Sequence, residues 1–339
     1  WFATWKNGSN HYMPEWMKSD AAKYPNIMGK NGKEVDSPSP HTQAAMEADA
    51  KAFGAVMKYL KKADPQYTIL MVQVQNEPGA WGSVRDYSTK AQKLFEGQVP
   101  VELLNPEILK ALNKPVIAKG TWTEVFGNDA DEYFHAWSVA RYIEYVAAAG
   151  KAEYQLPLYV NAALRDPITN PSASTYESGG PTDNVIPFWK VAAPSIDLLA
   201  PDIYLSGSEK VLKVIELYSR PDNALFVPEI SSSEENTRYF YSVLANGGIG
   251  FSPFGIDRNN QSSDEENAAR LVSVSREYVM AAPMMRELAK WAFEGKIKAV
   301  VEREDHAVQT IDLGLWKATI SYGAARRNTV EANAKPVSK

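Results

Sequence analysis

Two glutamates stand at matching places in this chain, each at the end of a short apolar segment. Glu77 ends the run that starts at Ile69 and continues Leu-Met-Val-Gln-Val-Gln-Asn, and a Pro-Gly pair follows it. Glu229 ends the run that starts at Ala224 and continues Leu-Phe-Val-Pro, and three serines follow Ile230. Apolar, β-branched runs of this length that are bounded by proline and glycine are typical of buried strands. We therefore expect both carboxyl groups at strand ends.

Carboxyl groups at such positions could act together as an acid and a nucleophile. In a parallel barrel, the carboxyl ends of the strands form the rim where chemistry takes place. A carboxylic acid beside an amide, as in Asn76-Glu77, suits acid/base catalysis on a glycosidic bond, provided that a second carboxylate faces it. Glu229 follows roughly 150 residues later, an interval that holds about three strand–helix units. This spacing is typical of retaining glycosidases, with the acid/base after strand four and the nucleophile after strand seven.

The motifs around these residues resemble those of glycoside hydrolase family 35, the β-galactosidases. The segment Met71-Val-Gln-Val-Gln-Asn-Glu-Pro-Gly79 is similar to that family's V-Q-I-E-N-E-Y-G strand. The segment Phe2-Ala-Thr-Trp-Lys-Asn-Gly8, with Pro-Glu-Trp16 after it, is similar to the family's A-E-W-x-x-G-G-x-P-x-W stretch at strand three. Together with the Val-Pro-Glu-Ile strand, these segments look like a bacterial branch of the family, over roughly residues 1 to 300.

The resemblance implies a fold and a set of roles. The fold is a TIM (β/α)8 barrel, here represented by strands three to eight. Glu77 is the acid/base and Glu229 the nucleophile, and the reaction needs no cofactor. Asn76 hydrogen-bonds the sugar 2-hydroxyl, and Tyr204 donates a hydrogen bond to the nucleophile.

Two departures from the family pattern concern the sugar that is recognised. Thr4 stands where the better-known members have a sugar-contacting Glu, and Pro78 replaces their Tyr. These changes bear on the galactose preference and leave the reaction class unchanged. We expect a retaining exo-β-glycosidase, first of all a β-galactosidase, acting on oligosaccharides. An endo-acting β-glucanase or β-mannanase and a non-catalytic carbohydrate-binding barrel remain as alternatives.

Further side chains are candidates for contact with the sugar. Trp5 and Trp122 fall beside presumed strand ends, and indole rings pack well on the C–H faces of sugars. Asn7 follows Trp5 in the strand-three motif, and Asn161 ends the predicted strand five with an amide directed at the same rim. We list all four as possible substrate-binding residues.

The remaining elements fit an alternation of strands and helices. Six strands are predicted, numbered three to eight in the barrel: Trp1 to Trp5, Ile69 to Pro78, Pro157 to Asn161, Leu198 to Tyr204, Ala224 to Glu229 and Gly248 to Phe254. The predicted helices run from an N-cap at Ser39 to Asp64, from Tyr133 to Ala149, from Glu209 to Tyr218, and from Asp264 through Pro283 to Gly295. Such alternation is what a parallel sheet requires.

The pattern changes after Lys296. From Trp316 to Tyr322, apolar and polar residues alternate with the period of two that marks a half-buried antiparallel strand. We expect a catalytic barrel over residues 1–295 and the start of a β-sandwich domain over 296–339. Because the first segment already reads as strand three, the chain is expected to be an internal piece of a longer polypeptide.

Composition excludes several other classes of function. The 339 residues are 45% hydrophobic with a net charge of −5, and no basic stripe suits nucleic acid or an anionic membrane. No apolar run is long enough to span a bilayer. The histidines lack metal-site spacing and cysteine is absent, so no metal is expected. The oligomeric state is not indicated, and the compartment stays open with a periplasmic or secreted location favoured.

Overall fold

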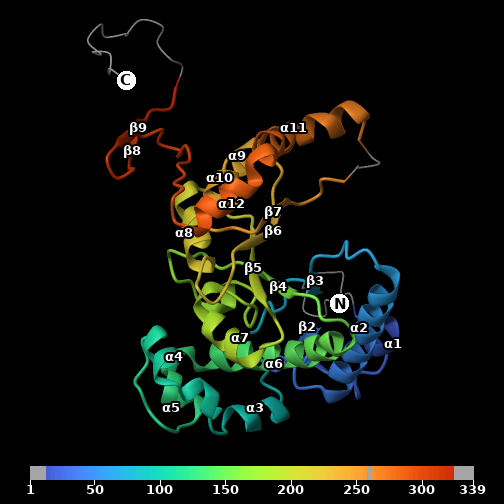
Figure 1. Cartoon of the computed structure of the whole chain (residues 1–339). Helices are drawn as coiled ribbons and strands as arrows, with labels where there is room; N and C mark the ends of the chain where they lie inside the picture. The colour runs from blue at the N-terminus through green and yellow to red at the C-terminus, as the bar shows by residue number, and fades with distance from the viewer. Residues whose placement is uncertain (1–12, 258–261, 324–339) are drawn as a thin grey trace, which may run out of the picture.

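A parallel sheet of five strands forms the centre of the computed structural model, which describes residues 13–257 and 262–323 (Figure 1). Its strands are β3 (Val72–Gln75), β4 (Leu158–Ala163), β5 (Leu198–Ile203), β6 (Phe226–Ile230) and β7 (Gly250–Pro253). Each strand pairs in parallel with the next one along the chain, in the order β3-β4-β5-β6-β7. A barrel wall has this sequential order, whereas a doubly wound sheet reverses its order at a switch point. The fold is therefore α/β of the TIM-barrel type.

Five of the six predicted strands are confirmed. Four of them, β3, β5, β6 and β7, are shorter than predicted, whereas β4 ends two residues later than predicted, at Ala163. The first, at Trp1 to Trp5, lies outside the described residues. Within the part of the chain that the structure describes, β3 and β7 are the two edges of the sheet and do not pair with each other. The central strand β5 is buried along all six of its residues, as expected for a parallel strand covered on both faces.

Two long helices, α2 (Gln43–Ala63) and α6 (Ala130–Glu153), pack against each other beside the sheet (Figure 1). They approach closely because α6 carries a glycine at the contact. A Cβ atom added to Gly150 would lie only 2.2 Å from Cε1 of Phe53 on α2. Phe53 and Met57 are both buried and lie on the face of α2 that packs in the core.

The start of α2 differs from the prediction. Its N-cap is Thr42 rather than Ser39. The Ser39 hydroxyl instead donates a 2.6 Å hydrogen bond to Asp86, a residue 47 positions away. A partner so distant in the chain leaves no local signal, so the Ser-Pro pair alone suggested the wrong start.

Shorter elements complete the described chain. An antiparallel hairpin of β1 (Asn26–Met28) and β2 (Glu34–Pro38) precedes α2. The other α-helices are α1 (Glu15–Lys18), α3 (Thr89–Phe95), α4 (Pro106–Ala111), α5 (Trp122–Phe126), α7 (Ile186–Ala192), α8 (Ser208–Tyr218), α9 (Glu234–Thr237), α10 (Phe240–Ala245), α11 (Asp264–Ala281) and α12 (Met285–Phe293). Across the described ranges, no helix has both the length and the apolarity needed to cross a membrane.

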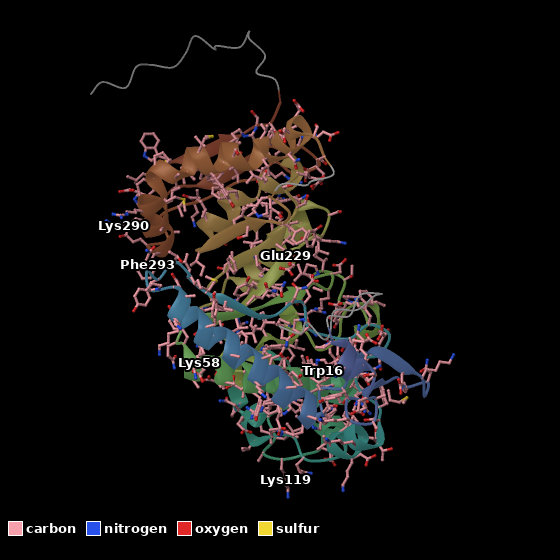
Figure 2. The ribbon with its side chains drawn as sticks, turned by 90° about the vertical axis from the view of Figure 1, so that its right-hand side faces the viewer. Trp16, Lys58, Lys119, Glu229, Lys290 and Phe293 are labelled. Atoms are coloured by element: carbon pink, nitrogen blue, oxygen red, sulfur yellow. The ribbon has the colours of Figure 1, made fainter. Side chains whose placement is uncertain are left out.

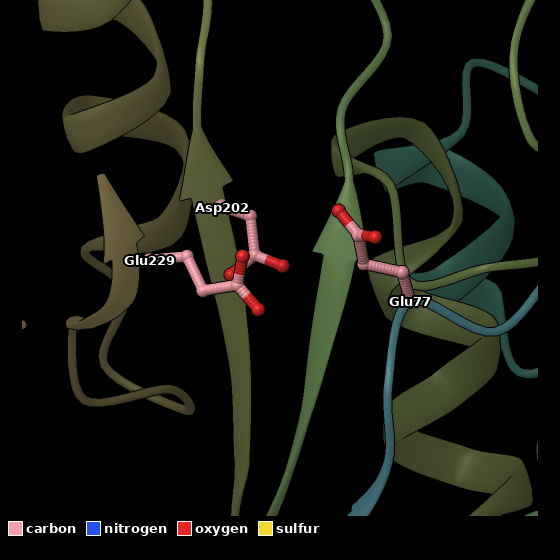
Figure 3. A group of neighbouring side chains, drawn as sticks. All are labelled: Glu77, Asp202 and Glu229. Atoms are coloured by element: carbon pink, nitrogen blue, oxygen red, sulfur yellow. The ribbon is translucent and has the colours of Figure 1, made fainter. Parts of the chain in front are cut away.

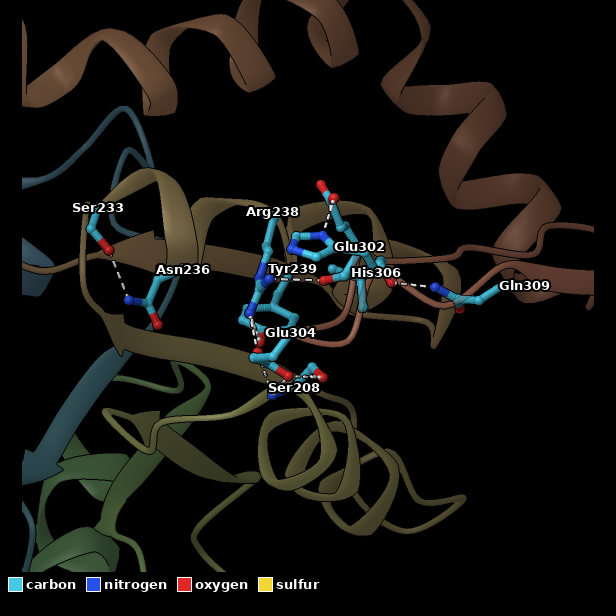
Figure 4. A network of polar contacts seen from close by, with 10 residues as sticks. Ser208, Ser233, Asn236, Arg238, Tyr239, Glu302, Glu304, His306 and Gln309 are labelled. Atoms are coloured by element: carbon cyan, nitrogen blue, oxygen red, sulfur yellow. Dashed lines mark hydrogen bonds and ion pairs between the residues drawn. The ribbon is translucent and has the colours of Figure 1, made fainter. Parts of the chain in front are cut away.

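The segment after Lys296 contains the predicted antiparallel strands, β8 (Gln309–Asp312) and β9 (Lys317–Ile320). Glu304 connects this segment to the barrel. Its carboxylate accepts hydrogen bonds from Nη2 of Arg238 at 2.6 Å and from Oγ of Ser208 at 2.6 Å (Figure 4). Ser208 is the first residue of α8, so the carboxylate also stabilises the start of a barrel helix. The predicted division into two domains at residue 295 stays a prediction.

Candidate active site

Three carboxylates meet at the carboxyl ends of the parallel strands. Glu77 follows β3, Asp202 lies in β5, and Glu229 lies in β6. One carboxylate oxygen from each residue lies within 4.8 Å of the others. Figure 3 shows the carboxyl groups of Asp202 and Glu229 next to each other and facing that of Glu77. In Figure 2, Glu229 lies near the middle of the elongated molecule, with Lys119 at one end.

Irregular pairing distinguishes the two strands that carry the glutamates. Between Val227 and Ile230, β6 has one residue more than the facing part of β7. Between Gln73 and Gln75, β3 likewise has one residue more than β4. The pairing of β4 with β5 is regular. Because an extra residue bends a strand and redirects its side chains, these irregularities help to aim the glutamates into the site.

The backbone of Glu77 is strained. Its φ angle of +42° lies in the left-handed region, which side chains other than glycine rarely adopt. The amide oxygen of Asn161 accepts a 2.8 Å hydrogen bond from the backbone N–H of Glu77. The side chain is 8% exposed. Strain held in place at a buried carboxyl group is a feature of functional sites.

Asn161 connects the parts of the site. Its Nδ2 atom donates to Oδ2 of Asp202 at 2.5 Å, to Oδ1 of Asn76 at 3.0 Å and, at a longer 3.4 Å, to Oε1 of Glu229. Its Oδ1 atom accepts from Glu77 and from Nε2 of Gln73, each at 2.8 Å. One amide thus contacts residues from β3, the turn after it, β5 and β6.

Asn161 is therefore misplaced in the predicted list of substrate-binding residues. It lies inside β4 rather than at its end, and its side chain is fully buried. Both sides of its amide are occupied by protein partners, an arrangement typical of a residue that positions other side chains. Gln73 extends this support, since its Oε1 atom accepts a 3.2 Å hydrogen bond from the Tyr159 hydroxyl.

Tyr204 lies where the sequence placed it, directly after β5. Its hydroxyl donates a 2.9 Å hydrogen bond to Oε2 of Glu229. Burial and the hydrogen bond to Glu229 raise the pKa of Tyr204 above its ordinary value. Tyr204 therefore stays protonated near neutral pH and can only donate in this contact, which favours Glu229 as a carboxylate.

Asp202 was not among the predicted site residues, although the sequence contains a signal for it. The tripeptide Pro-Asp202-Ile at the end of β5 has the same pattern as Pro-Glu229-Ile at the end of β6. In the sheet, Asp202 and Glu229 are direct partners across the two strands. Comparing the two tripeptides would have identified the third carboxylate.

The predicted role of Trp122 is wrong. Trp122 begins helix α5 instead of following a strand, and it is only 2% exposed. Its ring packs against Phe126 and Phe134, with ring centres 5.7 and 5.3 Å apart. The indole is therefore part of the aromatic core. Trp5 and Asn7 lie outside the described residues.

Three carboxylates at this spacing could in principle also coordinate a cation. In this cluster, however, Asn161 and Tyr204 already donate hydrogen bonds to oxygens of Asp202 and Glu229. Two of the carboxyl groups thus accept hydrogen bonds, and the third, that of Glu77, lies beside them. Such an arrangement suits the transfer of a proton. We interpret the cluster in this way.

The fold and the site together define a TIM-type α/β chain with a carboxylate cluster on the rim of its sheet. Among solved structures, the catalytic domain of beta-amylase from Paenibacillus polymyxa is similar, with a TM-score of 0.54 and 12% identity over 80% of each chain. At this identity the likeness shows the fold alone. A family model described as "Domain of unknown function (DUF5597)" matches residues 274–338. No curated protein matches the chain.

Proposed function

We propose that this chain is a retaining exo-β-glycosidase, with a β-galactosidase as the first candidate. The observation that carries the proposal is that one carboxyl oxygen of Glu77 lies within 4.8 Å of one carboxyl oxygen of Glu229 at the strand ends, a closest approach that is compatible with a retaining pair. Retaining enzymes have their two carboxyl groups about 5 to 5.5 Å apart. Inverting enzymes need roughly 6.5 to 9.5 Å because a water molecule must fit between the group and the sugar.

In the proposed mechanism, Glu229 attacks the anomeric carbon while Glu77 transfers its proton to the leaving glycosidic oxygen. The glycosidic bond breaks and an ester forms between the sugar and Glu229. Glu77, now a carboxylate, takes a proton from a water molecule, whose oxygen attacks the anomeric carbon and releases the sugar. The Glu77 proton and the Glu229 carboxylate are restored.

Neighbouring groups support these roles. The Tyr204 hydroxyl holds Glu229 at 2.9 Å and fixes the direction of its attacking oxygen. The oxygen of Asn76 accepts from Gln73 at 3.1 Å and from Asn161 at 3.0 Å. With that side of the amide held, its nitrogen is the side that can donate to a sugar 2-hydroxyl.

The choice of a β-galactoside follows from the resemblance to family 35 in the motifs around Glu77 and Glu229. The two glutamates determine the type of reaction, but they do not determine which sugar is recognised. A panel of nitrophenyl glycosides therefore tests the sugar preference. We expect β-galactoside to be cleaved fastest and its anomeric configuration to be retained in the first product seen by NMR. Cleavage of β-glucan or β-mannan polymers alone would favour an endo-acting enzyme.

Two other outcomes would overturn the proposal. Release of a sugar with inverted configuration would contradict double displacement, whatever the substrate. Binding of oligosaccharides without turnover, under conditions in which the chain is folded, would favour a carbohydrate-binding barrel instead. Starch belongs in the same panel, because the similar solved structure is named as a beta-amylase domain.

A further inference from the structure

Asp202 has the most buried carboxyl group of the cluster and no part in double displacement. It is 2% exposed, and it is the direct strand partner of Glu229. The amide nitrogen of Asn161 donates to its Oδ2 atom at 2.5 Å. A carboxylate is costly to bury unless donors compensate its charge, so its presence beside two catalytic carboxyl groups calls for a reason.

The directions of the hydrogen bonds indicate which groups are ionised. Asn161 donates to Asp202, and Tyr204 donates to Glu229, so the donors favour these two groups as carboxylates. Three negative charges with oxygens within 4.8 Å of one another repel strongly, and one proton in the cluster relieves this repulsion. The proposed function assigns this proton to Glu77, the acid of the first step.

We propose that Asp202 is a positioning residue that keeps the proton of the cluster on Glu77 by acting as a permanent neighbouring negative charge. The proposal rests on the proposed function of Glu77 and Glu229. It also explains how Glu77 works in the second step. When Glu229 is esterified its charge is lost, but that of Asp202 remains and keeps Glu77 basic enough to accept a proton from water.

Among the residues that the structure describes, the tyrosines around the cluster do not supply this charge. Burial, with the nearby Asp202 and Glu229 charges, raises the pKa of Tyr159 to about 12. Burial likewise raises the pKa values of Tyr204 and Tyr218, with the Asp202 charge contributing to both. These tyrosines are neutral near pH 7. Glu177, in the loop that packs against Gly79, is a further carboxyl group on the Glu77 side but does not belong to the cluster.

The test measures the proton affinity of Glu77 directly. Glutamate labelled with ¹³C at the side-chain carboxyl is incorporated into the whole chain, and the Glu77 signal is assigned as the one missing from Glu77→Gln. In Asp202→Asn, which keeps an oxygen to accept from Asn161, we expect the proton affinity of Glu77 to fall about tenfold, a shift of about one pH unit. Asp202→Glu should largely retain the parent value. An unchanged titration in a folded Asp202→Asn protein would overturn the proposal.

A matched control separates charge from packing. Asp49 of α2 is also fully buried and accepts a 2.7 Å hydrogen bond from Gln75 on β3, but it is not part of the cluster. Asp49→Asn should lower thermal stability and move the Glu77 titration less than Asp202→Asn does. An equal shift in both variants would show that loss of buried packing, and not the Asp202 charge, is responsible.

A second variant keeps the proposal testable if Asp202→Asn does not fold. Glu229→Gln removes the other charge and imitates the esterified state, with Asp202 in place. The pKa of Glu77 should then stay above the ordinary glutamate value of about 4.3, and a value at or below it would overturn the proposal. Because the NMR titration does not need turnover, a chain without glycosidase activity would refute the proposed function while the role of Asp202 is still decided.

The same effect should appear in the kinetics of an active chain. The alkaline limb of the kcat/KM profile reports the loss of the Glu77 proton in the free enzyme. In Asp202→Asn this limb should move to lower pH by about one unit. A uniform loss of rate with no shift of the limb would indicate a purely structural role and contradict the proposal.

Discussion

Glu77 and Glu229 carry out different steps in the proposed mechanism, so their removal should have different consequences. Glu229→Ala cannot form the glycosyl ester and should lose activity on every substrate. Glu77→Ala should still form the ester from substrates with good leaving groups, and added azide should restore its second step. Rates with a dinitrophenyl glycoside, with and without azide, make this comparison. Rescue of Glu229→Ala by azide with retained configuration would reverse the two assignments.

The strained backbone at Glu77 gives a second prediction, which concerns stability. A residue with a Cβ atom held at φ of +42° costs about 1 to 2 kcal/mol relative to glycine. We expect Glu77→Gly to have a higher free energy of unfolding than Glu77→Ala, by about 1 kcal/mol. Urea denaturation of the two variants measures the difference. Equal stabilities would show that the left-handed conformation is not retained in solution.

At the scale of elements, the contact between Glu304 and the first residue of α8 should make stability depend on pH. Hydrogen bonds from Ser208, together with the Arg238 guanidinium, lower the pKa of Glu304 from 4.5 to about 2. A carboxyl group with a depressed pKa in the folded state stabilises the fold above its ordinary pKa and loses this contribution as the pH falls. The stabilisation is thus complete near neutral pH and disappears between pH 4.5 and about 2.

The variant that tests this contact is Glu304→Gln. Near pH 7 it should be less stable than the parent by about 1 kcal/mol, a modest value because the Glu304 side chain is half exposed. The difference should shrink as the pH falls below 4.5. Glu294→Gln is the matched control, since Glu294 pairs only with Lys296 at the surface among the described contacts. A difference between Glu304→Gln and the parent that stays constant with pH would refute this account.

The elements differ in how well the sequence predicted them, and the reason is physical. The strands β3 to β7 were found because each is an apolar run whose pattern is local. The start of α2 was missed because Ser39 is held by Asp86, far away in the chain. Trp122 was misassigned because its place beside a strand was assumed, whereas helix α5 carries it into an aromatic core.

The same distinction applies to the site. The positions of Glu77, Glu229 and Tyr204 follow from strand ends, which sequence patterns locate well. The role of Asn161 depends on partners from three other segments, and no local pattern reports such partners. The full burial of its side chain became visible only with the sheet assembled.

At the scale of the whole molecule, the sheet order determines which residues can meet. Parallel strands in sequential order bring their carboxyl ends to one rim, so a residue after β3 and a residue in β6 converge with β4 and β5 between them. The strands in between supply Asn161 and Asp202, which explains why a network of polar groups joins the two glutamates. This convergence is the basis of the central claim, that Glu229 is a nucleophile and Glu77 its acid/base partner.

The most direct test of that claim is to trap the covalent intermediate. A 2-deoxy-2-fluoro-galactoside with a good leaving group slows the second step, so that the sugar remains attached to the nucleophile. Peptide mapping by mass spectrometry should then find one fluorosugar on Glu229 and none on Glu77 or Asp202. A label on either of those residues, or an absence of label in a chain that hydrolyses the substrate with inversion, would contradict the mechanism proposed for this site.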